Sequence, residues 1–596
     1  MPENPLEHYR ARLKTWRANY ADNQRRFRQL SGMRLAIGLV AVAMATLAFG
    51  PQWLSPWWLL APLIVFIVLA VIHDAVEQKR SRAARAAAYY ERALERLEHK
   101  WAGRGNGGER YRQPDHLYAD DLDVLGEGSL FELLNVTRTE AGERVLARWL
   151  LSPSDADTAR ARQKAIQELT PRWELREEIA LLGEDVRAAI DDEAAKIWGA
   201  APVRRFFPGV RIAGLALALA ALAAFVLFMM QAWTWRPFVL VLVAEMGLGL
   251  AVRDKVKAIV ASVSAPATEL RLLGELLARL EKEHFESPML KALARGLEKG
   301  AMPASIEIRR LERWVERLDW SRNQFFRAIA APLLWIPQCA IAIEKWRERH
   351  GPRIAEWVGA VAEFEALSCL ATFAYERPPA VFPELVENGS LFDGAALQHP
   401  LLDPRRAIAN DVHLSEDECR LWVVSGSNMS GKSTLLRSVG LNVVLAWAGA
   451  PVCCKELRVS ALRIGASIRV NDSLMDNKSR FYAEISRLRD VAELTKSGQP
   501  TLFLLDELLS GTNSHDRRIG AAAVVKGLVE RGAIGMVTTH DLALAEIAGE
   551  LGRRARNLHF EDHMEAGQMQ FDYQLRPGVV ERSNALELMR AVGLEV

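Results

Sequence analysis

The stretch GSNMSGKS at residues 426–433 constrains this chain more than any other feature. It fits the pattern G-x-x-x-x-G-K-[S/T], whose two glycines let the backbone curl so that its amides point at phosphate oxygens. Lys432 supplies a positive charge to the β- and γ-phosphates, and the Ser433 hydroxyl coordinates Mg²⁺. RLWVVS before the loop predicts a strand, and TLLRSVGLNVVLAWAG after it predicts a helix. We therefore expect a nucleotide-binding P-loop.

A second stretch, PTLFLLDELLSGTN at residues 500–513, predicts a buried strand that ends in two carboxylates. Asp506 at the strand tip is placed to hold the Mg²⁺ shell, and Glu507 to orient or deprotonate the attacking water. A further apolar strand, within AIGMVTTHD, ends next to His540. A lone histidine is more often structural, but this position favours contact with the γ-phosphate or the attacking water. These elements predict an ATPase core that uses ATP and Mg²⁺, with Lys432, Glu507 and His540 as catalytic residues.

Two uncharged apolar runs, residues 35–50 and 53–72, are separated by a turn at Pro51 and Pro56. A membrane-spanning helix needs about 20 apolar residues, so the second run is long enough and the first is slightly short. Basic residues flank the pair on both sides, which places both flanks in the cytoplasm. They are Arg34, Lys79, Arg80, Arg82 and Arg85. A transmembrane hairpin is expected, and a buried core hairpin is the alternative.

A second pair of runs, residues 212–230 and 238–252, has the same organisation, with Trp233 and Trp235 in its turn. Glu245 interrupts the last run, and a carboxylate inside a membrane is costly unless it is paired. A long amphipathic core hairpin is therefore a stronger alternative here. Prolines break a third run, residues 328–343, which we interpret as core.

Composition limits the remaining possibilities. The net charge of this 596-residue chain is only +2, so any nucleic-acid contact must come from local basic patches. Its five cysteines show no CxxC spacing, which argues against a disulfide framework or a zinc site. No cleavable signal peptide is apparent, because the first apolar run follows a basic, helix-like segment.

The P-loop and its surroundings resemble the MutS family of ATPases, whose loop typically reads G-P-N-M-G-G-K-S-T. This chain has GSNMSGKST, with Ser427 and Ser430 as departures. The resemblance implies nucleotide contacts from the whole loop, namely Gly426, Ser427, Asn428, Met429, Ser430, Gly431, Lys432, Ser433 and Thr434.

DELLSGTNSHD resembles the D-E-x-x-x-G-T-S segment of the same family. The resemblance implies that Ser510, Gly511, Thr512 and Asn513 reach the nucleotide of a partner subunit, and hence a homodimer with composite ATP sites. RIGASIRVNDSLMDNKSRFYAEI resembles another family segment, in which Ser479, Phe481 and Glu484 are retained and Arg480 replaces a threonine.

The resemblance extends into the helical half of the chain. Residues 128–153 are similar to the start of the family's helical core, and residues 361–374 to its lever helix. The expected fold is an α/β P-loop ATPase domain of the ABC type at the C-terminus, preceded by an all-α MutS-like lever domain with two transmembrane helical hairpins. We expect a basic helical segment (1–34), hairpin 1 (35–72), a helix and glycine-rich linker (73–115), the helical core (116–200 and 258–380) with hairpin 2 inserted (212–252), the ATPase domain (390–575) and dimerisation helices (576–596).

Two functions fit this organisation. The first is a multi-pass inner-membrane ATPase, with its motor in the cytoplasm, that acts as a dimeric clamp on mismatched or branched DNA. The second is a membrane-tethered mechanochemical ATPase that couples nucleotide state to an unknown protein partner or a membrane segment without reading DNA. No mismatch-reading domain is recognisable in residues 1–115, which favours the second. An ABC transporter is disfavoured, because DELLSGT does not match the L-S-G-G-Q motif.

Overall fold

The computed structural model describes residues 4–51, 53–182, 192–298, 302–321, 323, 326, 330, 332–427, 429–469, 480–509, 513–540, 542–565 and 568–580. The chain divides into two compact units. Unit 1 comprises residues 1–135, 147–184 and 369–596, and unit 2 comprises residues 136–146 and 185–368. A helical N-terminal region and a C-terminal α/β domain are therefore confirmed.

A six-stranded sheet forms the centre of the α/β domain in unit 1, with strand order β10-β9-β4-β8-β7-β6. All neighbouring strands are parallel except β9 and β10, which form an antiparallel edge pair. The strands are β4 (Leu421–Ser425), β6 (Arg463–Ser467), β7 (Thr501–Leu505), β8 (Ile534–Thr539), β9 (Ala555–Glu565) and β10 (Gln568–Pro577). Strands β4, β7 and β8 are buried along their whole length, as is typical of a parallel sheet covered on both faces.

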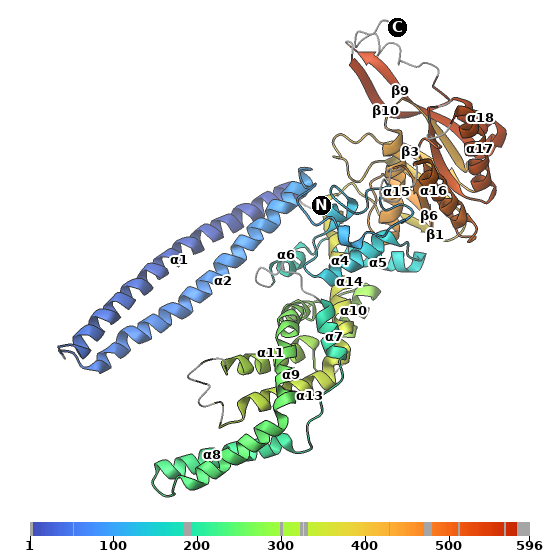
Figure 1. The fold of residues 1–596 in the computed structure, drawn as a ribbon. Helices are drawn as coiled ribbons and strands as arrows, with labels where there is room; N and C mark the ends of the chain where they lie inside the picture. The colour runs from blue at the N-terminus through green and yellow to red at the C-terminus, as the bar shows by residue number, and fades with distance from the viewer. Residues whose placement is uncertain are drawn as a thin grey trace. The chain divides into compact units, whose positions relative to one another are not determined.

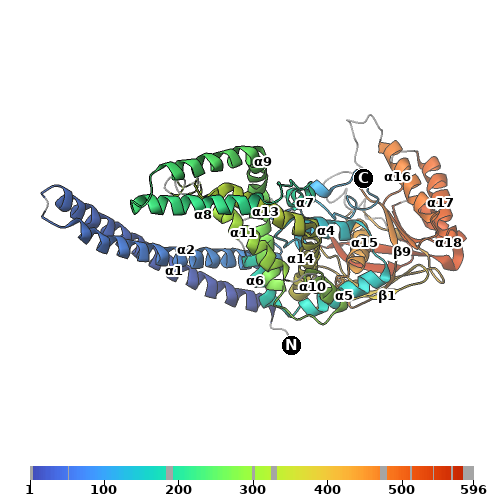
Figure 2. The same ribbon diagram turned by 90° about the horizontal axis from the view of Figure 1, so that it is seen from below.

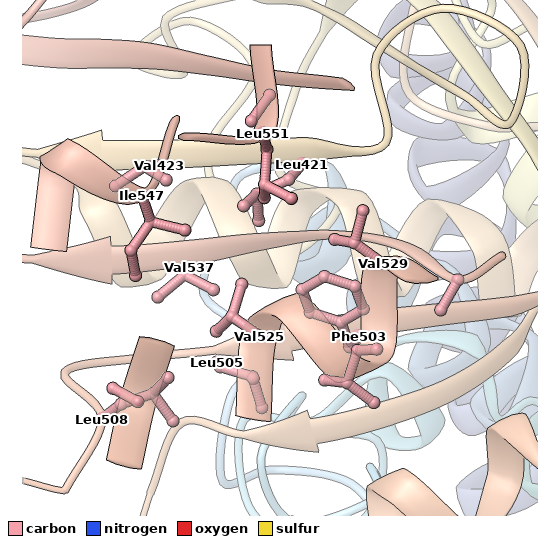
Figure 3. Packing of buried hydrophobic residues seen from close by; sticks show 14 of the residues in the cluster. Leu421, Val423, Phe503, Leu505, Leu508, Val525, Val529, Val537, Ile547 and Leu551 are labelled. Carbon is pink, nitrogen blue, oxygen red and sulfur yellow. The ribbon is translucent and has the colours of Figure 1, made fainter. Parts of the chain in front are cut away.

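Helices cover both faces of this sheet. Alternate side chains of β4, β7 and β8 point toward α16 (Arg480–Thr495), α17 (Ser514–Glu530) and α18 (Leu542–Leu551), where they form a continuous apolar core. Figure 3 shows Phe503 and Leu505 of β7 among the packed residues. On the other face lies α15 (Lys432–Ala448), whose Gly440 lies close to Leu122 and Leu504. The core fixes the strand register, and with it the positions of the strand ends.

A smaller sheet has the order β1-β5-β2-β3; three of its strands precede β4 in the chain, and β5 follows it. Its strands are β1 (Glu384–Val386), β2 (Leu391–Leu397), β3 (Asn410–Ser415) and β5 (Glu456–Ser460). Strand β2 pairs antiparallel with both β3 and β5, so this sheet differs in type from the parallel sheet that carries the P-loop.

Two long helices form an antiparallel hairpin at the start of unit 1 (Figures 1 and 2). Helix α1 (Pro5–Phe49) runs without a break through both the basic segment and the first apolar run, and α2 (Leu60–Leu97) follows a short 3₁₀ turn, η1 (Pro56–Leu59). The other helical elements of this unit are η2 (Glu109–Tyr111), α3 (Leu130–Leu134), α5 (Ala156–Leu169), α6 (Trp173–Leu181) and η5 (Gly552–Arg554).

The base of the hairpin is joined to α6 and to the last turn of α14 (Ile354–Glu376). Arg96 of α2 forms two hydrogen bonds with Glu376, at 2.6 and 2.9 Å. Arg12 of α1 pairs with Glu177 of α6 at 2.6 Å, and Tyr90 donates a hydrogen bond to the same carboxylate. Removing one partner of a buried ion pair costs about 3–5 kcal/mol. These pairs therefore anchor the hairpin firmly.

Unit 2 is helical. Its helices are α7 (Asp192–Ala200), α8 (Val210–Met229), α9 (Arg236–Leu280), α10 (Pro288–Glu298), α11 (Ala304–Trp320), α13 (Trp335–His350) and η3 (Gly351–Arg353). Helix α8 packs against α9, which continues far beyond the apolar run that it contains (Figure 1). Two helices cross between the units along the chain, α4 (Glu140–Leu151) and α14.

Four helical stretches of the described chain are long and apolar enough to cross a membrane, judged by length and composition alone. In Pro5–Phe49, Pro56–Leu97 and Val210–Met229, at most 22% of the most apolar window is buried within the protein. In Trp335–Glu376 the buried share is 78%. This last stretch is therefore largely buried, whereas the other three expose their apolar side chains. In the third apolar run, Cys339, Ala340, Ala342 and Ile343 of α13 are also buried.

A buried carboxylate in unit 2 joins α14 to the start of α4. The side chain of Glu365 accepts hydrogen bonds from the backbone amides of Arg138 and Thr139, at 3.0 and 3.3 Å, and from the Thr139 hydroxyl. Gly142 leaves space for it, since a Cβ there would lie 2.3 Å from a Glu365 oxygen. Burial raises the pKa of Glu365 to about 7, although these hydrogen bonds oppose the shift.

This pKa predicts a pH-dependent stability. Between about pH 4.5 and pH 7, folded Glu365 keeps a proton that the unfolded chain has released, so the free energy of unfolding falls as pH rises. Glu365→Gln cannot titrate and should reduce that fall by roughly 1 kcal/mol per pH unit. Urea denaturation of both proteins in mild detergent, followed by tryptophan fluorescence at pH 5 and pH 7, measures it. Equal slopes for the two proteins would contradict the prediction.

Candidate functional site

The loop between β4 and α15 has the backbone that its glycines predict. Gly426 and Gly431 have φ angles of 155° and 103°, where side chains are rarely tolerated. A Cβ on Gly426 would lie 2.7 Å from the Ser430 hydroxyl. Met429 also has a positive φ of 73° and is 84% exposed. The loop is therefore curled tightly at the N-terminus of a buried helix, where backbone amides attract anions.

Lys432 lies inside this curl. Its Nζ donates to the carbonyls of Gly426 and Ser427, both at 2.8 Å, and lies 3.9 Å from Glu507. Burial lowers the pKa of Lys432, and the charges of Glu507, Asp506 and Asp562 oppose that shift. The ammonium group is thus held by loop carbonyls that a phosphate oxygen can replace.

Ser433 and Asp506 meet although they lie far apart in the sequence. Ser433 lies in the first turn of α15, after the loop that follows β4, and its hydroxyl donates at 2.5 Å to Oδ2 of Asp506, which directly follows β7. In β8, between β4 and β7, Thr538 donates its hydroxyl proton to Asp506 Oδ1. The same Thr538 oxygen accepts from the amide of Glu507 at 3.1 Å. The Ser433 hydroxyl and the Asp506 carboxylate thus lie together, and oxygen ligands of this kind are those that Mg²⁺ prefers.

His540 lies where the sequence predicts. Its Nδ1 is 3.3 Å from Glu507 Oε1, and its side chain is 51% exposed. Glu507 has a positive φ of 47°, which is uncommon for a residue other than glycine. Residues in such strained backbone conformations cluster at functional sites, so Glu507 is a candidate functional residue. Lys432, Glu507 and His540 are thus brought together at one edge of the sheet.

The other predicted site residues are distributed around this centre. Ser430 is buried, and Thr434 lies in the first turn of α15. Asn428, Ser510, Gly511 and Thr512 lie outside the described residues. Asn513 is exposed and caps α17, because its side chain accepts from the amide of Asp516 at 2.8 Å.

Two contacts hold the segment after β7 in place. The amide of Leu509 donates to the carboxylate of Glu484 in α16, and the Arg517 guanidinium donates to the Leu509 carbonyl at 3.1 Å. Glu484 is 2% exposed. The sequence indicates this residue only through the family resemblance, and the structure places it next to the segment that follows β7.

Sequence reasoning missed Thr538 and Asp121. Asp121 is buried and accepts from the amides of Ile468 and Arg469, at 2.6 and 2.7 Å, and from the Arg487 guanidinium at 2.9 Å. It thereby ties the segment before α3 to the residues that follow β6 and to the middle of α16. The acidic run ADDLD was the available signal, but its partners lie far away in the sequence.

Comparison with known proteins agrees with this geometry. Residues 422–595 match the family described as MutS domain V, and residues 116–213 match MutS domain III. A protein named DNA mismatch repair protein MutS from Myxococcus xanthus (strain DK1622) is 28% identical over 547 residues, which cover 78% of this chain and 56% of that protein. A protein of the same name from Natronomonas pharaonis is 32% identical over 246 residues, or 41% of this chain and 28% of that protein.

The matched regions thus span about half or less of the length of these relatives. The two domain matches and the similar proteins support a relationship to the MutS family, with sequences of its domains III and V present in this chain.

Proposed function

We propose that this chain is a membrane-anchored, MutS-like ATPase whose nucleotide state switches a homodimer between two conformations. The observation that carries the proposal is the convergence of Lys432 and Ser433, at the start of α15, with Asp506 and Glu507, directly after β7, in a region that matches MutS domain V. The residues fit ATP and Mg²⁺, because the loop offers curled amides, a buried ammonium group and paired oxygen ligands.

When bound with Mg²⁺, ATP supplies a phosphoanhydride bond whose cleavage changes the charge held at the site. Lys432 would exchange its loop carbonyls for phosphate oxygens, and Ser433 and Asp506 would hold the metal. Thr538 keeps Asp506 and the Glu507 backbone in a fixed relation. Glu507 would orient the attacking water and take up its proton, and His540 would position Glu507.

In this proposal the dimer acts on DNA, as a clamp on mismatched or branched structures. Support comes from the relatives, whose names state DNA mismatch repair. Ser510–Asn513 would complete the partner's nucleotide site, so that ATP binding closes the dimer. Basic segments such as residues 309–327 would provide phosphate contacts, which are salt-dependent and independent of sequence.

A second candidate is a mechanochemical ATPase that acts on a membrane or protein partner and does not read DNA. The specific observation in its favour is the anchoring of the α1–α2 hairpin by Arg96–Glu376 and Arg12–Glu177. Glu376 ends α14, which leads directly into the α/β domain. A movement of α14 would therefore reach the hairpin.

Replacing the proposed base tests the chemistry. Glu507→Gln should leave ATP binding intact and lower the hydrolysis rate about 100-fold or more, because general-base catalysis contributes at least that much. The rate is measured by phosphate release, and binding by a fluorescent ATP analogue. Glu530→Gln, the same exchange at an exposed position of α17, is the matched control. Hydrolysis by Glu507→Gln at the parent rate would refute the assignment.

A DNA panel separates the two candidate functions. ATP turnover and DNA binding are measured for the full chain in detergent with homoduplex, mismatched and branched DNA. The clamp function predicts a change of rate and a preference for the altered DNA, with binding that weakens as salt rises. If no DNA changes either quantity, the DNA function is wrong and the mechanochemical one is favoured.

Membrane fractionation tests the anchor. The exposed apolar surfaces of Pro5–Phe49, Pro56–Leu97 and Val210–Met229 predict that the chain stays in the membrane pellet after an alkaline carbonate wash. A chain that is released into the supernatant would contradict the proposed membrane location without affecting the ATPase assignment.

A further inference from the structure

A groove lies between α1 and α2 where their polar halves meet their apolar halves. It has a volume of about 480 Å³ and is lined by Ser31, Arg34, Leu35, Gly38, Leu39, Val42, Phe66 and His73. Arg34 and His73 are the ionisable residues that directly adjoin the two uncharged runs, residues 35–50 and 53–72. The groove therefore has a polar end and an apolar end.

The polar end holds nitrogen atoms without partners. Arg34 Nε and His73 Nδ1 are both buried, and neither has a hydrogen-bond partner within the described chain. The Arg34 guanidinium lies 5.2 Å from the centre of the Phe66 ring. Burying an unpaired polar group is costly, so an arrangement of this kind favours an external acceptor.

Two acidic side chains of α2 follow His73 closely. Asp74 accepts from Gln78 at 3.1 Å, and Glu77, one turn beyond His73, accepts from Arg80 at 2.7 Å through one of its two oxygens. Arg80 also lies 4.3 Å from the Phe27 ring, which in turn lies 4.4 Å from the ring of His73. Arg34 itself has no ion pair among the described residues, so its guanidinium lacks a carboxylate partner there.

The apolar end is open. Leu39 and Val42 are 64% and 63% exposed, and a Cβ added to Gly38 would meet nothing within 4 Å. A chain of methylene groups can lie along this surface, starting at the basic end. Such a combination of a cationic pocket and an adjoining apolar track suits an anionic phospholipid.

We propose that this groove binds one anionic phospholipid, with its phosphate at Arg34, His73 and Ser31 and an acyl chain along Gly38, Leu39 and Val42. The proposal rests on the proposed membrane location. The bound lipid would then fix the depth of the hairpin at the cytoplasmic surface, next to the helices that reach α14.

The test measures lipid binding to the full-length protein in mild detergent. Phosphatidylglycerol, phosphatidylcholine and inorganic phosphate are added separately. Lipid retention is followed by native mass spectrometry, and protection from thermal unfolding is measured for each addition. The parent protein should prefer phosphatidylglycerol, and Arg34→Gln should bind it about tenfold more weakly, as expected for loss of a charge-assisted hydrogen bond. Arg28→Gln, at an exposed position of the same helix, should bind like the parent.

A second pair of variants tests the apolar track. Gly38→Leu fills the groove and should weaken phosphatidylglycerol binding, whereas Gly32→Leu, at an equally open position that does not line the groove, should not. Both changes favour the helix, so neither should unfold it.

Three outcomes would overturn the proposal: equal retention of both lipids, equal effects of the matched variants, or equal protection from thermal unfolding by inorganic phosphate and phosphatidylglycerol. If the protein stays in the carbonate-washed pellet but shows any of these outcomes, only the proposed lipid site is wrong. Release from the pellet removes the membrane location itself.

Discussion

The hydrogen bond from Ser433 to Asp506 is the contact around which the α/β domain is organised. It joins residues 73 positions apart in the sequence, because parallel strands bring their carboxyl ends to one edge of the sheet. Strand β8 lies between β4, which leads into the loop before Ser433, and β7, which ends just before Asp506. It contributes Thr538, whose hydroxyl donates to Asp506 and accepts from the Glu507 amide. The site thus depends on the buried register of three strands, and any slip of that register would separate its charges.

Much of this site could be predicted from the sequence, since a short motif encodes its own local backbone. Gly426 and Gly431 adopt positive φ angles as the P-loop pattern requires, and Asp506 and Glu507 follow a fully buried strand. Thr538 could not be singled out, because its role depends on β8 lying between β4 and β7. That strand order comes from the tertiary fold, and the local pattern does not contain it.

In the helical half of the chain, less of the structure could be predicted from the sequence. Apolar runs and basic flanks predicted two helical hairpins. The change from basic to apolar sequence at residue 34 does not end a helix, however, because α1 continues through it without a break. The buried pairs at its base were also not predictable. Arg96 and Glu376 are separated by 280 positions, and each alone reads as an ordinary charged residue on a helix surface. Asp121 escaped for the same reason, since its partners follow it by more than 340 positions.

The buried ion pairs also limit how the α1–α2 hairpin can move relative to the end of α14. An uncompensated charge in this region would cost several kcal/mol, so Arg96 and Glu376 must move together. Glu376 ends the same helix that carries Glu365, and an α-helix transmits displacement along its axis because its backbone hydrogen bonds are all internal. A shift of α14 would consequently be passed to the base of α2 without loss of a contact. Helix α14 is the stiff element, and the Arg96–Glu376 ion pair connects it to the hairpin.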